Sequence, residues 1–312
     1  MTNFPRVGSD IPAYLALILS MVFVGSSMTT NTFIVDDVPV MIAGLLRFLI
    51  AAVFILVITF AVDGELPQLD RRSHLTVLAQ SLFGSFLFTV LTLHGVSMTT
   101  AMISGIILAA SPAMVAILSW LLGDRLSRIA WVGVLLTIGG VLVVNVLDAP
   151  DENGATRPLL GALLILLAVL SESLYTIFSR LVAKKASPLG LTCWYSMYGA
   201  LLFLIPGLWQ MRDFDLGTIP VSAWVALTYA GAFVGSAAAV FWYFGLRQLP
   251  TSVAGAVTGV MPIAAVLSAW LIAGDHFGWP HLVGMALIVG GIVLVARSRG
   301  RGIERKADLL SR

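Results

Sequence analysis

The sequence is poor in charged residues. Asp, Glu, Lys and Arg together make up 11% of its 312 residues, whereas 59% are hydrophobic. A typical soluble domain has roughly 25% charged and 45–50% apolar residues. The shortage of charge therefore excludes an ordinary water-soluble domain. It also leaves long uncharged runs, and about 20 apolar residues in a helix are enough to cross the hydrocarbon core of a bilayer.

Cysteine, histidine and enzyme motifs are scarce as well. The single cysteine, Cys193, excludes an internal disulfide and is interpreted as a small packing residue. The four histidines fall at predicted loops or helix ends and lack the spacing of a metal site. The chain contains neither a P-loop nor a G-x-S-x-G motif. We therefore predict no enzymatic activity, no metal and no cofactor.

What the chain does contain is a series of ten apolar runs. Because none alternates with period two, transmembrane β-strands are excluded and helices are the remaining way to span a membrane. The first run lacks a basic start and a cleavage site, so we expect a retained helix rather than a signal peptide. The fold class predicted is an all-α integral membrane protein with ten transmembrane helices. These cover residues 11–32, 38–62, 73–94, 98–122, 127–147, 158–182, 188–210, 219–245, 250–273 and 277–296.

Lys and Arg are distributed unevenly over the predicted loops. With the N-terminus in the cytoplasm, 15 of the 18 lie on the cytoplasmic side, Arg157 and Arg212 lie outside, and Arg47 lies within the second helix. Cytoplasmic loops carry such an excess, so both termini are predicted to be cytoplasmic. The basic tail 297–312 is typical of topology determinants and lipid contacts, because it directly follows a membrane helix. We therefore expect the lipid bilayer, not nucleic acid, as its partner.

The second half of the sequence repeats the first. The pairs aligned at an offset of 150 residues are Gly95 with Gly245, Gly105 with Gly255, Pro112 with Pro262 and Trp120 with Trp270. After one inserted residue, Asp124 aligns with Asp275, and Gly139-Gly140 with Gly290-Gly291. The predicted units are a first five-helix repeat (1–147), an extracytoplasmic linker (148–157), a second repeat (158–296) and the tail.

Five helices per half is an odd number, so the second half must cross the membrane in the opposite direction. Inverted repeats of this kind are typical of secondary transporters, in which the solute site lies near the midplane between the halves. Pro112 and Pro262 lie within predicted helices and leave the carbonyls of Leu108 and Thr258 without a helical donor. Such carbonyls are potential acceptors for an amine, although the prolines could simply bend packed helices.

The repeated pattern, a helix with an internal proline followed by G-D-x-[LF] and a helix ending G-G-x-x-L-V, resembles the EamA-type branch of the drug/metabolite transporter superfamily. Arg47 in the stretch RFLIAA is similar to the arginine of that family's second helix. Val24-Gly25 departs from the family's Trp-Gly, and Asp124 and Asp275 replace its more frequent glutamates. The resemblance implies ten helices in two inverted halves that move metabolites, amino acids or drugs across bacterial inner membranes, often as exporters.

Glu172 is a carboxylate in the middle of an apolar segment. It lies 14 residues after Pro158, about 20 Å along a helix. A charge at that depth costs roughly 2.5–3.5 kcal/mol on insertion scales. A buried carboxyl group can also take up and release a proton near neutral pH. The carboxylate is therefore a candidate for coupling transport to protons.

Glu172, Thr176 and Arg180 are spaced four residues apart on one helical face. This register is similar to the first helix of the small multidrug-resistance transporters. The resemblance implies that Glu172 is the proton or substrate site, Thr176 lines it and Arg180 is an inner anchor. The alternative is a structural ion pair between Glu172 and Arg47 that holds the two halves together.

Other polar, aromatic and small residues are candidates for lining a solute cavity. Small polar residues and glycines between membrane helices often serve packing alone, and aromatic residues near helix ends often form interfacial belts. At depth, aromatic rings can instead surround a cation. The candidates are Ser27, Asn31, Gln80, Phe88, Gly105, Tyr175, Thr176, Trp242, Gly255 and Thr258.

The sequence therefore predicts a secondary active transporter that moves a small metabolite, amino acid or amphipathic drug by alternating access, with protons as a candidate coupling partner. Export is the preferred direction. An uptake permease or a facilitative uniporter is the alternative within transport. An intramembrane enzyme or a signalling protein is the alternative of another class.

Overall fold

The computed structural model of the chain describes residues 11–108, 110–111, 113–114, 117–118, 127–147, 157–249, 257, 260–274, 278–291 and 293–294. Every regular element in these ranges is a helix. Six helices are long and apolar enough to cross a membrane, which agrees with the all-α prediction. Their bounds are Ile11–Val35, Val40–Val62, Arg71–Val96, Pro158–Ser179, Pro188–Asp213 and Val221–Gln248.

The long helices begin and end close to the predicted positions. They comprise α1 (Ile11–Val35), α2 (Val40–Val62), α3 (Arg71–Ser81) continuing into α4 (Phe88–Val96), α8 (Pro158–Val182), α9 (Pro188–Gln210), and α10 (Val221–Tyr229) continuing into α11 (Ala238–Gln248). The shorter described elements are α5 (Ala101–Leu108), α7 (Arg128–Leu147), α13 (Val260–Ser268), the π-helix η5 (Ala269–Ala273) and a helix from Trp279 to Gly291. Parts of the predicted helices 98–122 and 250–273 lie outside the described residues.

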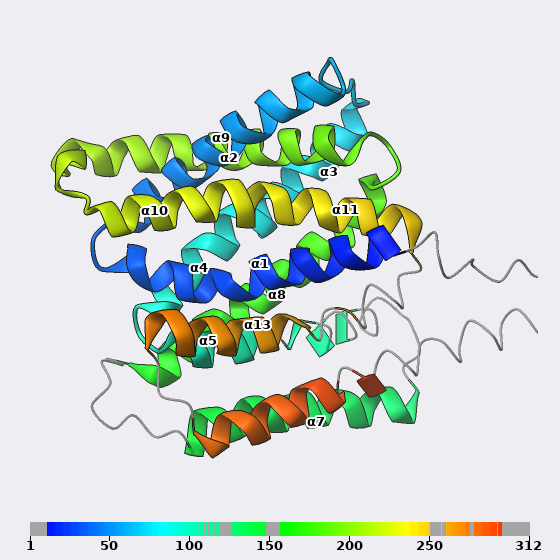
Figure 1. Cartoon of the computed structure of the whole chain (residues 1–312), viewed down its shortest axis with the longest axis vertical. Coiled ribbons are helices and arrows are strands. Elements are labelled where there is room, and N and C mark those ends of the chain that lie inside the picture. The colour runs from blue at the N-terminus through cyan, green and yellow to red at the C-terminus, as the bar shows by residue number, and fades with distance from the viewer. Residues whose placement is uncertain are drawn as a thin grey trace, which may run out of the picture.

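The helices run side by side in stacked rows (Figure 1). α2 and α9 lie together at one edge, followed by the row of α10 and α11, then α1, then α13 and α5. At the far edge α7 lies beside the helix Trp279–Gly291. α1 is central, since it contacts α4, α5, α10, α11 and α13. α8 contacts α3, α4 and α5, so helices from both halves of the chain meet around the interior.

Two of the long helices contain a π-helical segment in mid-course. The first is η1 (Leu82–Leu87), between α3 and α4, and the second is η4 (Ala230–Ala237), between α10 and α11. Each contains the dipeptide Gly-Ser, as Gly84-Ser85 and Gly235-Ser236. π-helical turns are rare in proteins, and many of those that occur lie at functional sites. These two segments lie in the third and eighth predicted helices, which are equivalent in the sequence repeat.

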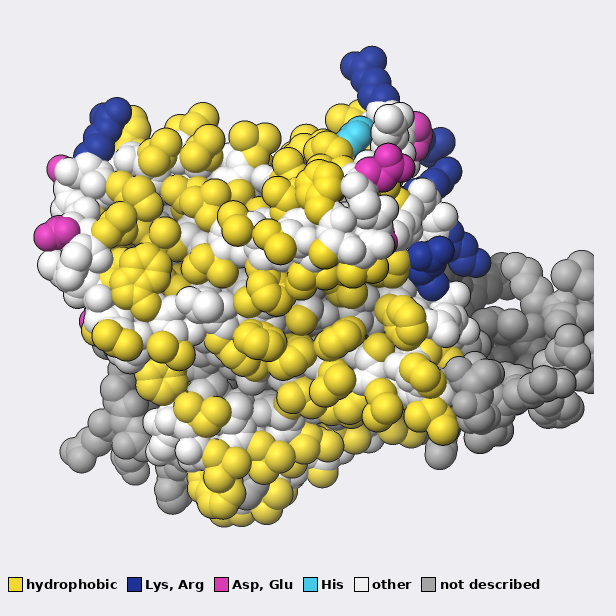
Figure 2. All heavy atoms as spheres, turned by 45° about the horizontal axis from the view of Figure 1, so that its top comes forward, with side chains coloured by type: hydrophobic (Ala, Val, Ile, Leu, Met, Phe, Trp, Pro, Cys, Tyr) yellow, Lys and Arg dark blue, Asp and Glu magenta, His cyan; other side chains and the backbone are white. Residues whose placement is uncertain are grey.

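The surface separates apolar faces from two polar ends. Hydrophobic side chains cover the visible face between the ends, and Lys and Arg gather mainly at one of them (Figure 2). That end, called the basic end below, is where α3 begins and α8 and α11 end, and these helix ends carry Arg71, Arg72, Lys184, Lys185 and Arg247. The turn between α1 and α2 and the turn between α9 and α10 lie at the opposite end.

Candidate functional site

Glu172 lies on α8 within the bundle. Its side chain is partly buried, and its Oε2 atom is buried without a hydrogen-bond partner among the described residues. The hydroxyl of Ser111 lies within hydrogen-bonding reach of the carboxyl group. Thr176, one turn further, donates its hydroxyl to the backbone carbonyl of Glu172 at 3.1 Å. An unpartnered carboxylate oxygen in the interior is costly, so this atom is suited to receive a proton, a cation or a solute donor.

A hydrogen-bonded cluster lies between Glu172 and the basic end. The side-chain amide nitrogen of Gln80, on α3, donates to Ser179 Oγ at 2.9 Å and also to the hydroxyl of Tyr243 on α11. Ser179 in turn donates to the backbone carbonyl of Tyr175 at 2.8 Å. The Tyr175 ring lies 5.5 Å from that of Tyr195, centroid to centroid. The cluster joins α3, α8, α9 and α11.

Arg47, on α2, is buried at 5% exposure, and its Nε atom has no hydrogen-bond partner among the described residues. Its guanidinium carbon lies 5.8 Å from the centre of the Phe48 ring. Tyr195 is close enough to interact with it electrostatically. Within the described part of the chain, Arg47 and Glu172 do not form an ion pair. The alternative role of a Glu172–Arg47 bridge between the halves therefore has no support from this structure.

The polar residues of α1 differ in their surroundings. Ser20 donates to the carbonyl of Ala238 at 2.8 Å, and Ser27 to that of Val24 at 2.6 Å, so both hydroxyls are used in packing. Asn31 is 1% exposed, and neither its amide nitrogen nor its amide oxygen has a described partner. A buried amide without partners costs about 1–3 kcal/mol in proteins. Asn31 is therefore a stronger site candidate than Ser27.

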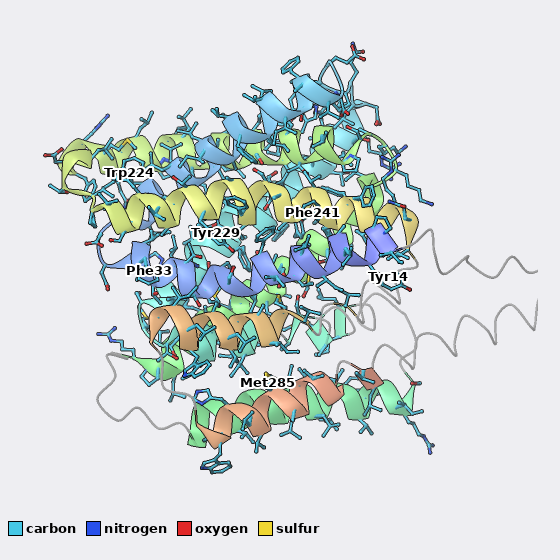
Figure 3. The ribbon with its side chains drawn as sticks, in the orientation of Figure 1. Tyr14, Phe33, Trp224, Tyr229, Phe241 and Met285 are labelled. Carbon is cyan, nitrogen blue, oxygen red and sulfur yellow. The ribbon has the colours of Figure 1, made fainter. Side chains whose placement is uncertain are left out.

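Two of the three aromatic candidates are buried, and Tyr175 is partly buried. Phe88 and Trp242 are 7% and 8% exposed and belong to the same apolar core, and Trp242 Nε1 has no described partner. Tyr243 is 0% exposed, so an interfacial belt does not describe it. The aromatic cluster on the molecular surface is a different one. Tyr229 and Phe241, on α10 and α11 (Figure 3), pack against Phe23 of α1.

Gly105 serves close helix packing, because a Cβ atom there would collide with the side chain of Ala265 on α13. Gly84 is covered in the same way by the ring of Tyr175. Gly255, Thr258 and Pro112 lie outside the described residues. Pro262 lies within α13, although its side chain and that of Arg180 are not described.

The site candidates predicted from the sequence did not include Ser179, Tyr195 or Tyr243. Each lies on an apolar helix near a predicted membrane interface, where aromatic and small polar residues are common. Only the packing of four helices brings these side chains to Gln80 and Tyr175. A weak signal did exist, since Ser179 lies seven residues after Glu172 and thus on a similar face of the same helix.

Comparison with known proteins agrees with this architecture. The model of the EamA-like transporter family matches the chain twice, over residues 11–146 and 159–297. A solved structure titled "Crystal structure of protein" is similar in fold, with a TM-score of 0.65, 18% sequence identity and coverage of 91% of this chain and 97% of that chain.

Several bacterial proteins are similar in sequence. The uncharacterized transporter YetK of Bacillus subtilis is 34% identical over 287 residues, which cover 92% of this chain and 87% of YetK. The inner membrane protein YtfF of Escherichia coli is 25% identical, with 91% and 92% covered. A probable terminal-alkyne amino-acid exporter of Streptantibioticus cattleyicolor is 25% identical over 66% of this chain and 67% of its own. The chain is thus a multi-pass membrane protein and belongs to the EamA-like transporter family.

Proposed function

We propose that this transporter is a secondary active exporter of the bacterial inner membrane, which moves a small metabolite, amino acid or amphipathic drug by alternating access. In this proposal Glu172 binds the coupling proton or a cationic group of the solute. The observation that carries it is the buried Oε2 of Glu172, which has no hydrogen-bond partner among the described residues, inside a helical bundle of this family. Arg47 and Asn31 supply further buried polar atoms, on other helices, that have no partner in the described part of the chain.

The proposal includes ten helices in two inverted halves. Equivalent contacts in the two halves support it: Gly95 packs against Ile165, and its repeat counterpart Gly245 packs against Leu17. The first contact joins α4 to α8, and the second joins α11 to α1, so the first helix of each half packs on the third helix of the other. The separate matches of one family model to the two halves also support a duplication.

Amino acids are a reasonable first class of solutes to test. One relative is named as a probable amino-acid exporter, and a buried carboxylate is suited to an ammonium group. The test is a solute screen in proteoliposomes that contain a pH-sensitive dye, under an imposed pH gradient. We expect one or more solutes to move protons only in vesicles that contain the protein. Solute movement without proton movement would instead indicate a uniporter, and inward accumulation an uptake permease.

The proposed orientation places the basic end in the cytoplasm. Arg71, Arg72, Lys184, Lys185 and Arg247 lie there, and the excess of Lys and Arg follows the positive-inside rule. We predict that green fluorescent protein fused to the C-terminus is fluorescent in intact cells, and that alkaline phosphatase fused there is inactive. A fusion after residue 213, between α9 and α10, should give the reverse pattern. Active phosphatase at the C-terminus would refute this orientation.

A further inference from the structure

We infer that Gln80, Ser179 and Tyr243 form a latch that holds the helices together at the basic end, and that the repeat-equivalent described residues at the opposite end form no such latch. The inference rests on the proposed alternating-access function, because it names the residues that decide which end of the bundle opens. All three side chains are fully buried. They come from α3, α8 and α11, so the three helices cannot separate at this level without breaking the bonds from Gln80.

The position of the latch fits this role. Gln80 lies nine residues after Arg71, and Tyr243 lies four residues before Arg247, so the latch lies between Glu172 and the basic end. Tyr175 and Tyr195 pack beside it with their rings 5.5 Å apart. Closure at this level separates Glu172 from the aqueous phase at the basic end.

The sequence repeat identifies the residues that occupy the equivalent positions at the opposite end. The matching contacts Gly95–Ile165 and Gly245–Leu17 relate α4 to α11 and α1 to α8. By the same offsets, Tyr243 corresponds to Leu93 and Ser179 to Asn31. The shared Gly-Ser dipeptide of the two π-helices aligns Gln80 with Gly231.

The equivalent trio at the opposite end cannot form the same bonds. Leu93 and Gly231 carry no hydrogen-bonding side chain. Leu93 is part of an apolar cluster with Ile34 and Ile42. Asn31 therefore has no partner for either polar atom of its amide among the described residues. The repeat explains this, because Leu93 and Gly231 occupy the positions of Tyr243 and Gln80. At these equivalent positions the two ends therefore differ: Gln80 forms hydrogen bonds at the basic end, whereas Asn31, Leu93 and Gly231 form none with one another among the described residues.

Opening the basic end exchanges each hydrogen bond from Gln80 for bonds to water, and the net worth of such a bond is about 0.5–1.5 kcal/mol. At the repeat-equivalent positions of the opposite end, Leu93 and Gly231 have no side-chain hydrogen bond to exchange. The chain should therefore rest closed at the basic end and open more often at the opposite end.

The lone cysteine provides a labelling site on α9 near the basic end. Cys193 is 0% exposed and lies five residues into α9 from its start at the basic end. In vesicles with the basic end outward, we expect Tyr243→Phe to raise the rate of Cys193 labelling by a membrane-impermeant maleimide about fivefold, as expected for loss of one net hydrogen bond. Gln80→Leu removes two hydrogen bonds and should raise the rate further. The matched control is Tyr229→Phe. It removes a 2.7 Å hydrogen bond between Tyr229 on α10 and Ser26 on α1, away from the latch, and should leave the labelling rate unchanged.

Hydrogen exchange provides a second measurement that does not depend on the cysteine. We expect faster amide exchange in α3 and α11 of Tyr243→Phe, with α2 unchanged. Unchanged labelling and unchanged exchange in both latch variants would overturn the inference. Neither measurement uses a solute, so the two proposals can fail separately. If the latch variants show faster labelling or exchange but no solute is transported, the proposed function is refuted and the latch is not.

Discussion

Glu172→Gln is expected to abolish the proton-coupled component of solute transport. Glutamine has nearly the shape of a protonated glutamate but cannot release a proton. Because Oε2 of Glu172 has no hydrogen-bond partner among the described residues, the substitution alters the contact to Ser111 and removes the electrostatic interactions with Tyr175 and Tyr195. The measurement is solute flux and dye response in proteoliposomes, with and without a pH gradient.

The control for this experiment is Glu65→Gln, which removes an exposed carboxylate in the connection between α2 and α3. It should transport like the unmodified protein. If Glu172→Gln instead kept full gradient-driven flux, Glu172 would not be the coupling site. A loss of flux at all pH values together with a lower Tm would point to a structural role.

Gly140→Leu is expected to destabilise the contact between α7 and the helix Trp279–Gly291. A Cβ atom on Gly140 would lie 2.6 Å from the carbonyl oxygen of Gly284 and 2.7 Å from the side chain of Ile288. The larger side chain must force the two helices apart, and overpacking of this kind typically costs about 1–3 kcal/mol. The expected result is a Tm several degrees lower in detergent, read from the loss of the monodisperse peak on heating.

The neighbouring glycine gives a matched control. A Cβ atom on Gly139 meets no described atom within 4 Å, so Gly139→Leu should leave the Tm almost unchanged. The repeat predicts the same contrast in the second half, between Gly290, which is open, and Gly291, which packs against Gly133 and Thr137. Equal Tm values for Gly139→Leu and Gly140→Leu would contradict the packing described here.

The sequence alone determined the class of the protein and the course of its long helices. Length and hydrophobicity suffice for this, because a bilayer admits helices of about 20 apolar residues and few alternatives. The segments 158–182 and 188–210 were predicted with the bounds that α8 and α9 have. Glu172 could be recognised from the sequence as well, because a charged residue within a long apolar run is visible without the structure.

Only the tertiary structure decided which polar side chains meet. Gln80, Ser179 and Tyr243 lie far apart along the chain and are ordinary residues in their own helices. Contacts between helices depend on the rotation of each helix about its axis and on the crossing angles between helices. The apolar pattern of the sequence says little about either, because lipid surrounds the bundle and most helix faces are hydrophobic. For the same reason the sequence could not show that Asn31 lacks partners among the described residues, that Tyr243 is buried, or that Arg47 and Glu172 stay apart.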